Sequence, residues 1–220
     1  HGDLVFSPYP YIETMSQHEK KHLGPTTTPG YKVGAAKTTD EYAKLDAEDE
    51  SPARWKASLG IVPGAGGDTS RPKVEILSLE LHSDTLPPGK TIVFDIAKLK
   101  EESKDKKVLV IEKPITIKED VDYNVRIKFK VNHGVISGVR YKQVVKAGLG
   151  VKIPVDTLDQ MLGSYPPNSQ PYTKEFDTDH SPKGMIARSG KYSVTSIVID
   201  DDKEVYAKWE WSFKLASEWA

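Results

Sequence analysis

Cysteine is absent from the 220 residues of the sequence. Disulfides are therefore excluded, and because small extracellular domains often depend on them, the absence favours a reducing compartment such as the cytoplasm. No apolar run approaches the roughly 18 residues that a membrane-spanning helix needs. A charge excess of one sign is lacking too, since the formal net charge is -1. We expect a cytoplasmic protein without stable membrane insertion and without a nucleic-acid partner.

Recognisable catalytic arrangements are also missing. The segment His18–His22 matches the H-E-x-x-H motif of zinc proteases in its letters. That chemistry needs a buried amphipathic helix and a third ligand, whereas this segment is polar and ends at Leu23-Gly24-Pro25. The aspartates 200–202 fit a polar hairpin turn better than a metal site. We therefore expect a binding protein with no metal and no cofactor, and keep a zinc peptidase as a rival hypothesis.

The sequence divides into a polar first third and an apolar remainder that begins near Val74. Met15 is the expected natural start, so residues 1–14 are expected to be an addition. Residues 15–71 are called the arm here. They contain too few apolar side chains to offset the entropy of ordering, which predicts a flexible, largely disordered segment. Residues 72–220 are long enough to bury a core and form the expected domain.

One part of the arm is compatible with helix. Around residues 38–59, Ser51 can act as an N-cap with Pro52 at the first helical position. Trp55 and Leu59 then share one helix face, and Gly60 is a natural stop. Such short helices are unstable alone, so we expect a helix-turn-helix that forms on a partner. A solvated acidic linker is the alternative.

After Pro72 the apolar pattern acquires a period of two, as in Tyr123–Val131, where apolar and polar residues alternate strictly. Turn sequences rich in Pro, Gly, Asn and Asp separate the candidate strands. The pattern predicts an all-β, immunoglobulin-like β-sandwich. The expected strands are Val74–His82, Thr91–Ile96, Lys107–Glu112, Ile115–Lys118, Tyr123–Val131, Val135–Val145, Gln160–Tyr165, Tyr192–Asp200 and Val205–Leu215.

Some strands carry more apolar residues than a two-layer core requires. Ile197 and Ile199 stand beside the face formed by Tyr192, Val194 and Val198. Surplus apolar surface could line a space between the sheets and hold an apolar ligand. A simply well-packed core explains the same residues equally well.

Several longer stretches are specific enough to suggest a family. They are Leu45–Ser51, Ile136–Tyr141, Gly150–Ile153, Met161–Tyr165, Pro182–Arg188, Asp200–Lys203 and Trp209–Trp211. In this order they resemble the Rho GDP-dissociation inhibitors, from about Tyr31 to Trp219. The resemblance implies a sandwich that takes up the geranylgeranyl group of prenylated, mainly GDP-bound Rho, Rac and Cdc42 proteins, extracts them from membranes and inhibits GDP release and GTP hydrolysis. It also implies an inhibitor that is monomeric on its own.

By position, the resemblance assigns two sets of residues. The lipid-binding set is Leu79, Leu81, Ile115, Ile127, Val135, Val194 and Trp211. The GTPase-binding set is Tyr31, Leu45, Asp49, Ser51 and Trp55 in the arm, with Asp179, Asp201 and Asp202 in the domain. Trp55 stands where the family often has Tyr, and Pro114 and Lys191 stand where some relatives have phosphorylatable serines.

Two binding proteins remain as alternatives. A general prenyl- or lipid-binding chaperone of immunoglobulin-like fold would need the lipid site without an arm that reads the GTPase. A carbohydrate-binding or adhesion sandwich would normally be secreted and rich in disulfides.

Overall fold

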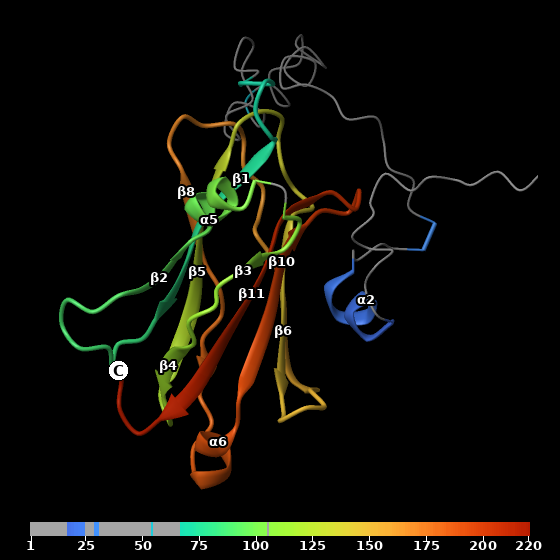
Figure 1. The fold of residues 1–220 in the computed structure, drawn as a ribbon. Helices are drawn as coiled ribbons and strands as arrows, with labels where there is room; N and C mark the ends of the chain where they lie inside the picture. Colours follow the sequence, from blue (N-terminus) through green and yellow to red (C-terminus); the bar gives the residue numbers. More distant parts are fainter. Residues whose placement is uncertain (1–16, 25–28, 31–53, 55–66, 105) are drawn as a thin grey trace, which may run out of the picture.

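The computed structural model describes residues 17–24, 29–30, 54, 67–104 and 106–220. These residues form a sandwich of two β-sheets that face each other (Figure 1). The expected all-β class is confirmed. The helix-turn-helix expected at 38–59 lies outside the described residues, as do five predicted GTPase contacts: Tyr31, Leu45, Asp49, Ser51 and Trp55.

The first sheet has the strand order β2-β1-β5-β8, and β9 pairs with the start of β5. All its neighbouring strands are antiparallel. Its apolar residues alternate as the period of two predicts, so one face is buried and the other is polar. The strands are β1 (Val74–His82), β2 (Ile92–Asp95), β5 (Asp122–Val131), β8 (Tyr172–Glu175) and β9 (Asp179–His180).

The second sheet has the order β3-β11-β10-β6-β7, and β4 pairs with β11. The short strands β3 and β4 run parallel to β11, whereas the other neighbours are antiparallel. Its members are β3 (Leu109–Val110), β4 (Ile115–Lys118), β6 (Arg140–Ala147), β7 (Ile153–Met161), β10 (Tyr192–Ile199) and β11 (Val205–Ala216).

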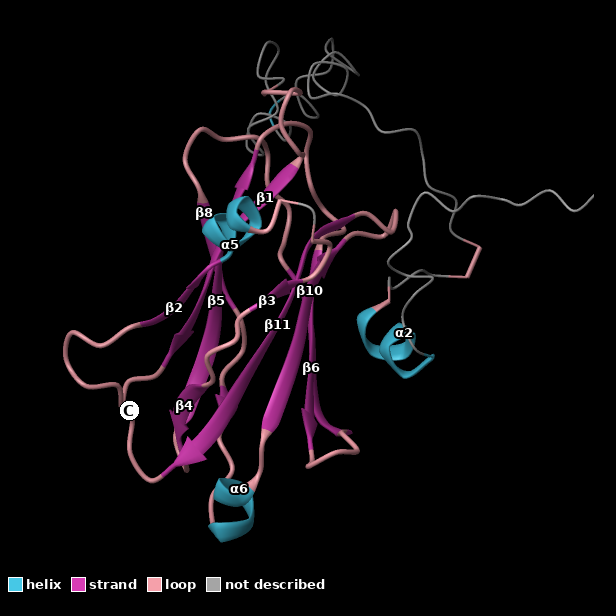
Figure 2. Cartoon of the chain, in the orientation of Figure 1, coloured by secondary structure: helices cyan, strands magenta, loops and turns pink. Residues whose placement is uncertain are grey.

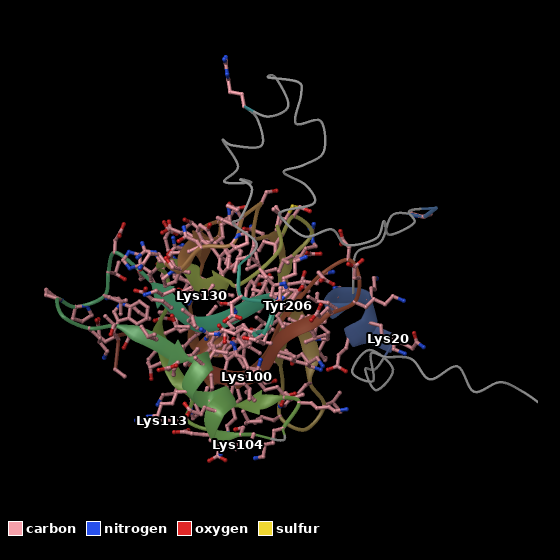
Figure 3. All side chains as sticks on the ribbon, turned by 90° about the horizontal axis from the view of Figure 1, so that it is seen from above. Lys20, Lys100, Lys104, Lys113, Lys130 and Tyr206 are labelled. Atoms are coloured by element: carbon pink, nitrogen blue, oxygen red, sulfur yellow. The ribbon has the colours of Figure 1, made fainter. Side chains whose placement is uncertain are left out.

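The main core fills the space between the sheets. Trp209, Phe129 and Ile127 are fully buried there. The ring of Tyr141 stacks on Phe176 at 4.8 Å between centroids, which joins β6 to the segment after β8. Figure 3 looks along the strands and shows side chains packed through the sandwich, with Lys104 and Lys113 at its periphery.

Helices contribute little to the described fold (Figure 2). They are α2 (Gln17–Leu23), α5 (Ile96–Glu102) and α6 (Met185–Ser189). Helix α5 begins where the side chain of Asp95 accepts the backbone N–H of Lys98 at 2.9 Å, an N-cap. None of the described helices has the length and apolar character to span a bilayer.

Helix α2 packs on the outer face of the second sheet. It belongs to the arm, which the sequence predicted to be largely disordered. Its Leu23 is completely buried against Val144, Ile197 and Ile199. Lys142 Nζ donates to the carbonyl of Gly24 at the end of the helix. The surplus apolar residues of β10 therefore do not line a space between the sheets: they alternate onto the opposite face and bury Leu23.

The expected strands agree with the observed ones where one face is buried. Val74–His82 and Ile115–Lys118 have the observed bounds. The strand expected at Gln160–Tyr165 is wrong in position, because the observed strand runs over Ile153–Met161. Pro154 argues against a strand at this position, because proline is found in sheets mainly on edge strands and at bulges. Here it faces Lys146 on the sheet's edge, beside a register shift.

Candidate functional site

A cavity of about 760 Å³ opens between the two sheets at one end of the sandwich. Its volume lies within the roughly 300–1,000 Å³ of small-molecule sites. Both sheets and two connections contribute to it. The lining residues are Tyr123, Val145, Ala147, Gly148, Leu149, Val155, Asp156, Asp179, His180, Pro182, Ile186, Ser189, Gly190, Lys191, Tyr192 and Phe213.

The cavity is lined on one side by a pair of aromatic rings. Tyr192 and Phe213 are register partners on β10 and β11, and their rings stack at 4.7 Å between centroids. Tyr192 Oη donates to the carbonyl of Ala187 at 3.0 Å, so the ring is fixed on α6. The aromatic surface continues inward through Trp211, 5.9 Å from Phe213, to Phe94. This wall suits an apolar ligand.

Two carboxyl groups face each other at the rim. Burial raises the pKa of Asp156, and the nearby charge of Asp179 raises it further. Asp179 also accepts a hydrogen bond from Tyr123 Oη at 3.3 Å. Desolvation and the same carboxylates raise the pKa of Tyr123, which keeps its hydroxyl protonated as a donor. The rim is therefore acidic and prepared for a cationic group.

Charged groups fasten the wall formed by β9 and α6 to the start of β5 and to the turn before it. His180 Nδ1 lies 2.6 Å from Asp122 Oδ1, and its Nε2 lies 3.1 Å from Asp120 Oδ1. These two contacts raise the pKa of His180. Lys183 also pairs with Asp120, at 3.1 Å. The backbone N–H of Gly184 donates to Glu119 at 2.8 Å, which lowers the pKa of that carboxyl.

The structure brings together most of the predicted lipid-binding residues, but in the closed core behind the cavity. Six of the seven belong to the core cluster or pack against it: Leu79, Leu81, Ile115, Ile127, Val194 and Trp211. Val135 is separate, in the connection between β5 and β6. None of the seven is among the residues that line the cavity. Their part in lipid binding stays a prediction.

Apart from Asp179, which was assigned to the GTPase, sequence reasoning missed the residues that line the cavity. Tyr192 and Phe213 belonged to recognised alternating strands, so their inward direction was a usable signal. Val155 and Ile186 gave none, because one lies on the strand placed wrongly and the other on an unexpected helix.

The described GTPase-binding candidates fall at opposite ends of the sandwich. Asp179 lies at the cavity rim. Asp201 and Asp202 lie in the turn that joins β10 to β11. Strand β10 has eight residues, so this turn is roughly 25 Å from the cavity.

The end of the sandwich that carries the β10–β11 turn, called the turn end here, is also where the arm joins the domain. The backbone N–H of Asp68 donates to the carbonyl of Asn132 at 2.7 Å, beyond the end of β5. Within the described part of the chain, no group of three or more His, Asp or Glu side chains is arranged to hold a metal.

Comparisons with known proteins give one consistent result. The family model described as RHO protein GDP dissociation inhibitor matches residues 14–218. A Rho GDP-dissociation inhibitor of Schizosaccharomyces pombe is 39% identical over 87% of this chain and 88% of its own length. The corresponding Saccharomyces cerevisiae protein is 38% identical over 86% of this chain and 91% of its own. Rho GDP-dissociation inhibitor 1 of Rattus norvegicus is 32% identical over 96% and 97%.

Proposed function

The chain belongs to the RHO protein GDP dissociation inhibitor family, and we propose that it binds prenylated, mainly GDP-bound Rho, Rac and Cdc42 proteins in the cytoplasm. In this proposal it buries their geranylgeranyl group, removes them from membranes and inhibits GDP release and GTP hydrolysis. The observation that carries the proposal is the cavity of about 760 Å³ between the sheets, with its stacked wall of Tyr192 and Phe213. No bond is made or broken, and no cofactor is needed.

The affinity for lipid follows from apolar burial. Each methylene removed from water contributes roughly 0.8 kcal/mol, so a 20-carbon isoprenoid grosses on the order of 10 kcal/mol. A bilayer offers the same group a similar gain. Extraction therefore needs further contacts that a membrane does not provide.

The two ends of the sandwich are suited to supply such contacts. Asp156 and Asp179 at the rim favour a basic peptide segment next to the lipid-bearing residue, because an incoming cation relieves their mutual repulsion. Asp201 and Asp202 lie at the other end, where the arm joins the domain. About eight extended residues span the roughly 25 Å between these ends. A GTPase held at the turn end thus reaches the cavity with its carboxyl-terminal tail.

The test is extraction from membranes. Vesicles that carry geranylgeranylated, GDP-loaded Rho protein are mixed with the inhibitor and sedimented. We expect the GTPase to appear in the supernatant in stoichiometric amounts, and unprenylated GTPase to bind much more weakly. A GTPase that stays with the vesicles would refute the proposal. Uptake of a geranylgeranyl-cysteine probe without any extraction would favour a general lipid chaperone.

A further inference from the structure

The end of the sandwich that carries the cavity mouth also gathers exposed apolar side chains. Nine large hydrophobic side chains in the described part of the chain are exposed, and six of them lie within residues 149–155 or on α6. The most exposed are Ile186 at 90%, Val151 at 82%, Met185 at 79% and Leu149 at 76%. Figure 1 shows α6 and the β6–β7 turn at the end opposite the entry of the arm. Such clustering marks an interaction surface.

Local geometry holds these side chains outward. Gly148 has φ 137°, and a Cβ there would lie 2.2 Å from the carbonyl oxygen of Val151. Only glycine fits, so the tight turn that presents Leu149 and Val151 is specified by the sequence. On α6, the carbonyl of Ala187 is fixed by Tyr192 Oη and the N-terminus is fixed by Glu119. The exposed Met185 and Ile186 are thus carried by a helix that is held at its N-terminus and at its central residue Ala187.

The exposed surface is continuous with the cavity. Leu149 and Ile186 belong to the exposed set and also line the cavity. An isoprenoid could therefore pass from an apolar medium into the sandwich without crossing water.

We propose that this end of the sandwich is a membrane-docking surface, on which Leu149, Val151, Met185 and Ile186 enter the interface of a phospholipid bilayer while the cavity mouth faces the lipid. The inference rests on the proposed function and extends it to the step before lipid transfer. A small cluster of apolar side chains beside a lipid site suits shallow, reversible insertion into the bilayer interface, unlike a lipid anchor or a spanning helix.

Charge favours an anionic bilayer. Lys152 is exposed between Val151 and Ile153, and Lys191 is exposed at the cavity rim. Lysines beside inserted apolar residues reach lipid phosphates. Lys183 and Arg188 on the same wall are paired with Asp120 and Glu119 and so contribute less. The exposed rim aspartates Asp156 and Asp179 oppose this attraction, so the apolar side chains carry the docking and the two lysines add to it.

The experiment separates docking from lipid binding. The double variant Val151→Asp/Met185→Asp changes two surface residues that do not line the cavity. The matched control is Met161→Asp, because Met161 is exposed at the other end of β7, about 26 Å from the turn. Two quantities are measured for each protein: the affinity for a soluble geranylgeranyl-cysteine probe, and the rate of extracting prenylated GTPase from phosphatidylcholine vesicles with and without phosphatidylserine.

We expect the double variant to bind the probe within about twofold of the parent but to extract about tenfold more slowly, the factor that about 1.4 kcal/mol represents. Met161→Asp should extract at the parent rate. Lys152→Glu should slow extraction only from vesicles with phosphatidylserine. Equal extraction rates for the double variant and the control would overturn the inference. Concentration-dependent sedimentation of the parent that the double variant lacks would also overturn it. That result would show that a second copy of this chain, and not a bilayer, covers the surface. If the parent does not bind the probe, the proposed function itself fails.

Discussion

Val155 offers the sharpest test of the cavity as the lipid site. It lines the cavity but is 55% exposed, so replacement by Asp should change the free energy of unfolding by no more than about 0.5 kcal/mol. A bound isoprenoid would cover the exposed half of the side chain. Burying a whole Val contributes about 1.5 kcal/mol, so the variant forfeits roughly 0.8 kcal/mol of lipid contact.

The carboxylate adds a second penalty. Covering even a neutral polar group without a partner costs roughly 1–3 kcal/mol in proteins, and an ionised carboxylate costs more. The neighbouring Asp156, with its raised pKa, gives the new carboxylate no compensation. The sum is at least about 2–4 kcal/mol, which weakens lipid binding by on the order of a hundredfold or more.

Fluorescence titration with a geranylgeranyl-cysteine probe measures this loss directly. Val155→Thr serves as the matched control, because it keeps the shape without the charge and should lose less than tenfold. An Asp variant that binds the probe within threefold of the parent would show that the lipid does not pass Val155. The predicted set around Val194 and Trp211 in the closed core would then be the better site.

Three further outcomes follow from the contacts. Asp122 and Asp120 raise the pKa of His180. The stabilisation that His180 gives to the β9–α6 wall is therefore complete below the unfolded pKa of about 6.5 and is lost as pH rises through the raised pKa. Hydrogen exchange in residues 179–190 should become faster over that pH window, and His180→Ala should remove the pH dependence. Asp156 also has a raised pKa, so its ionisation destabilises the fold as pH rises above about 3.9; Asp156→Asn should raise the melting temperature at pH 7 yet weaken binding of a GTPase with a basic tail, and an unchanged melting temperature would count against the carboxyl pair. Leu23→Asp should abolish exchange protection of α2, since the helix has seven residues and one fully buried anchor; protection equal to that of the parent would show that Leu23 does not hold it.

The sequence predicted those strands in which one face is buried, because apolar and polar residues then alternate along the strand. Asp122–Val131 alternates because its inner residues, such as Ile127 and Phe129, are buried between sheets. The same rule predicts the inward direction of Tyr192 and Phe213. It does not predict that the sheets separate beside them, because the cavity also depends on the turn at Gly148 and the anchored α6. Those contacts join segments that are far apart in the sequence. Hydrophobic periodicity is a local pattern and gives no information about them.

The sequence also did not show which residue covers the outer face of β10. Ile197 and Ile199 looked like surplus core because nothing in the sequence shows that Leu23, more than 170 positions earlier, covers them. A lone leucine in a polar segment carries no helical periodicity. The sequence thus located the apolar residues correctly, and only the fold revealed which face each one serves.

The arrangement of the two ends predicts that lipid binding and GTPase recognition are separable. The C-terminal end of the arm meets the domain beside Asn132, roughly 25 Å from the cavity, and sites this far apart without shared partners contribute additively. Deleting residues 31–59 keeps α2, its contact through Leu23 and the attachment at Gly67. We expect this variant to bind the geranylgeranyl-cysteine probe within twofold of the parent but to inhibit GDP release at least tenfold less effectively.

Nucleotide-release kinetics and probe titration on the same preparation measure both quantities. The variant Leu23→Asp is the control for displacement of α2, which a longer deletion would confound. Inhibition that survives the deletion would assign GTPase recognition to the domain, with Asp201 and Asp202 as its remaining acidic contacts at that end. A parallel loss of probe affinity would instead mean that the two ends are coupled through strands that run between them, such as β5, which leads from Tyr123 at the cavity to the attachment at Asn132. Independent effects are expected because Gly67 and Asp68 contact His133 and Asn132 beyond the end of β5, and neither of these two residues lines the cavity between the sheets.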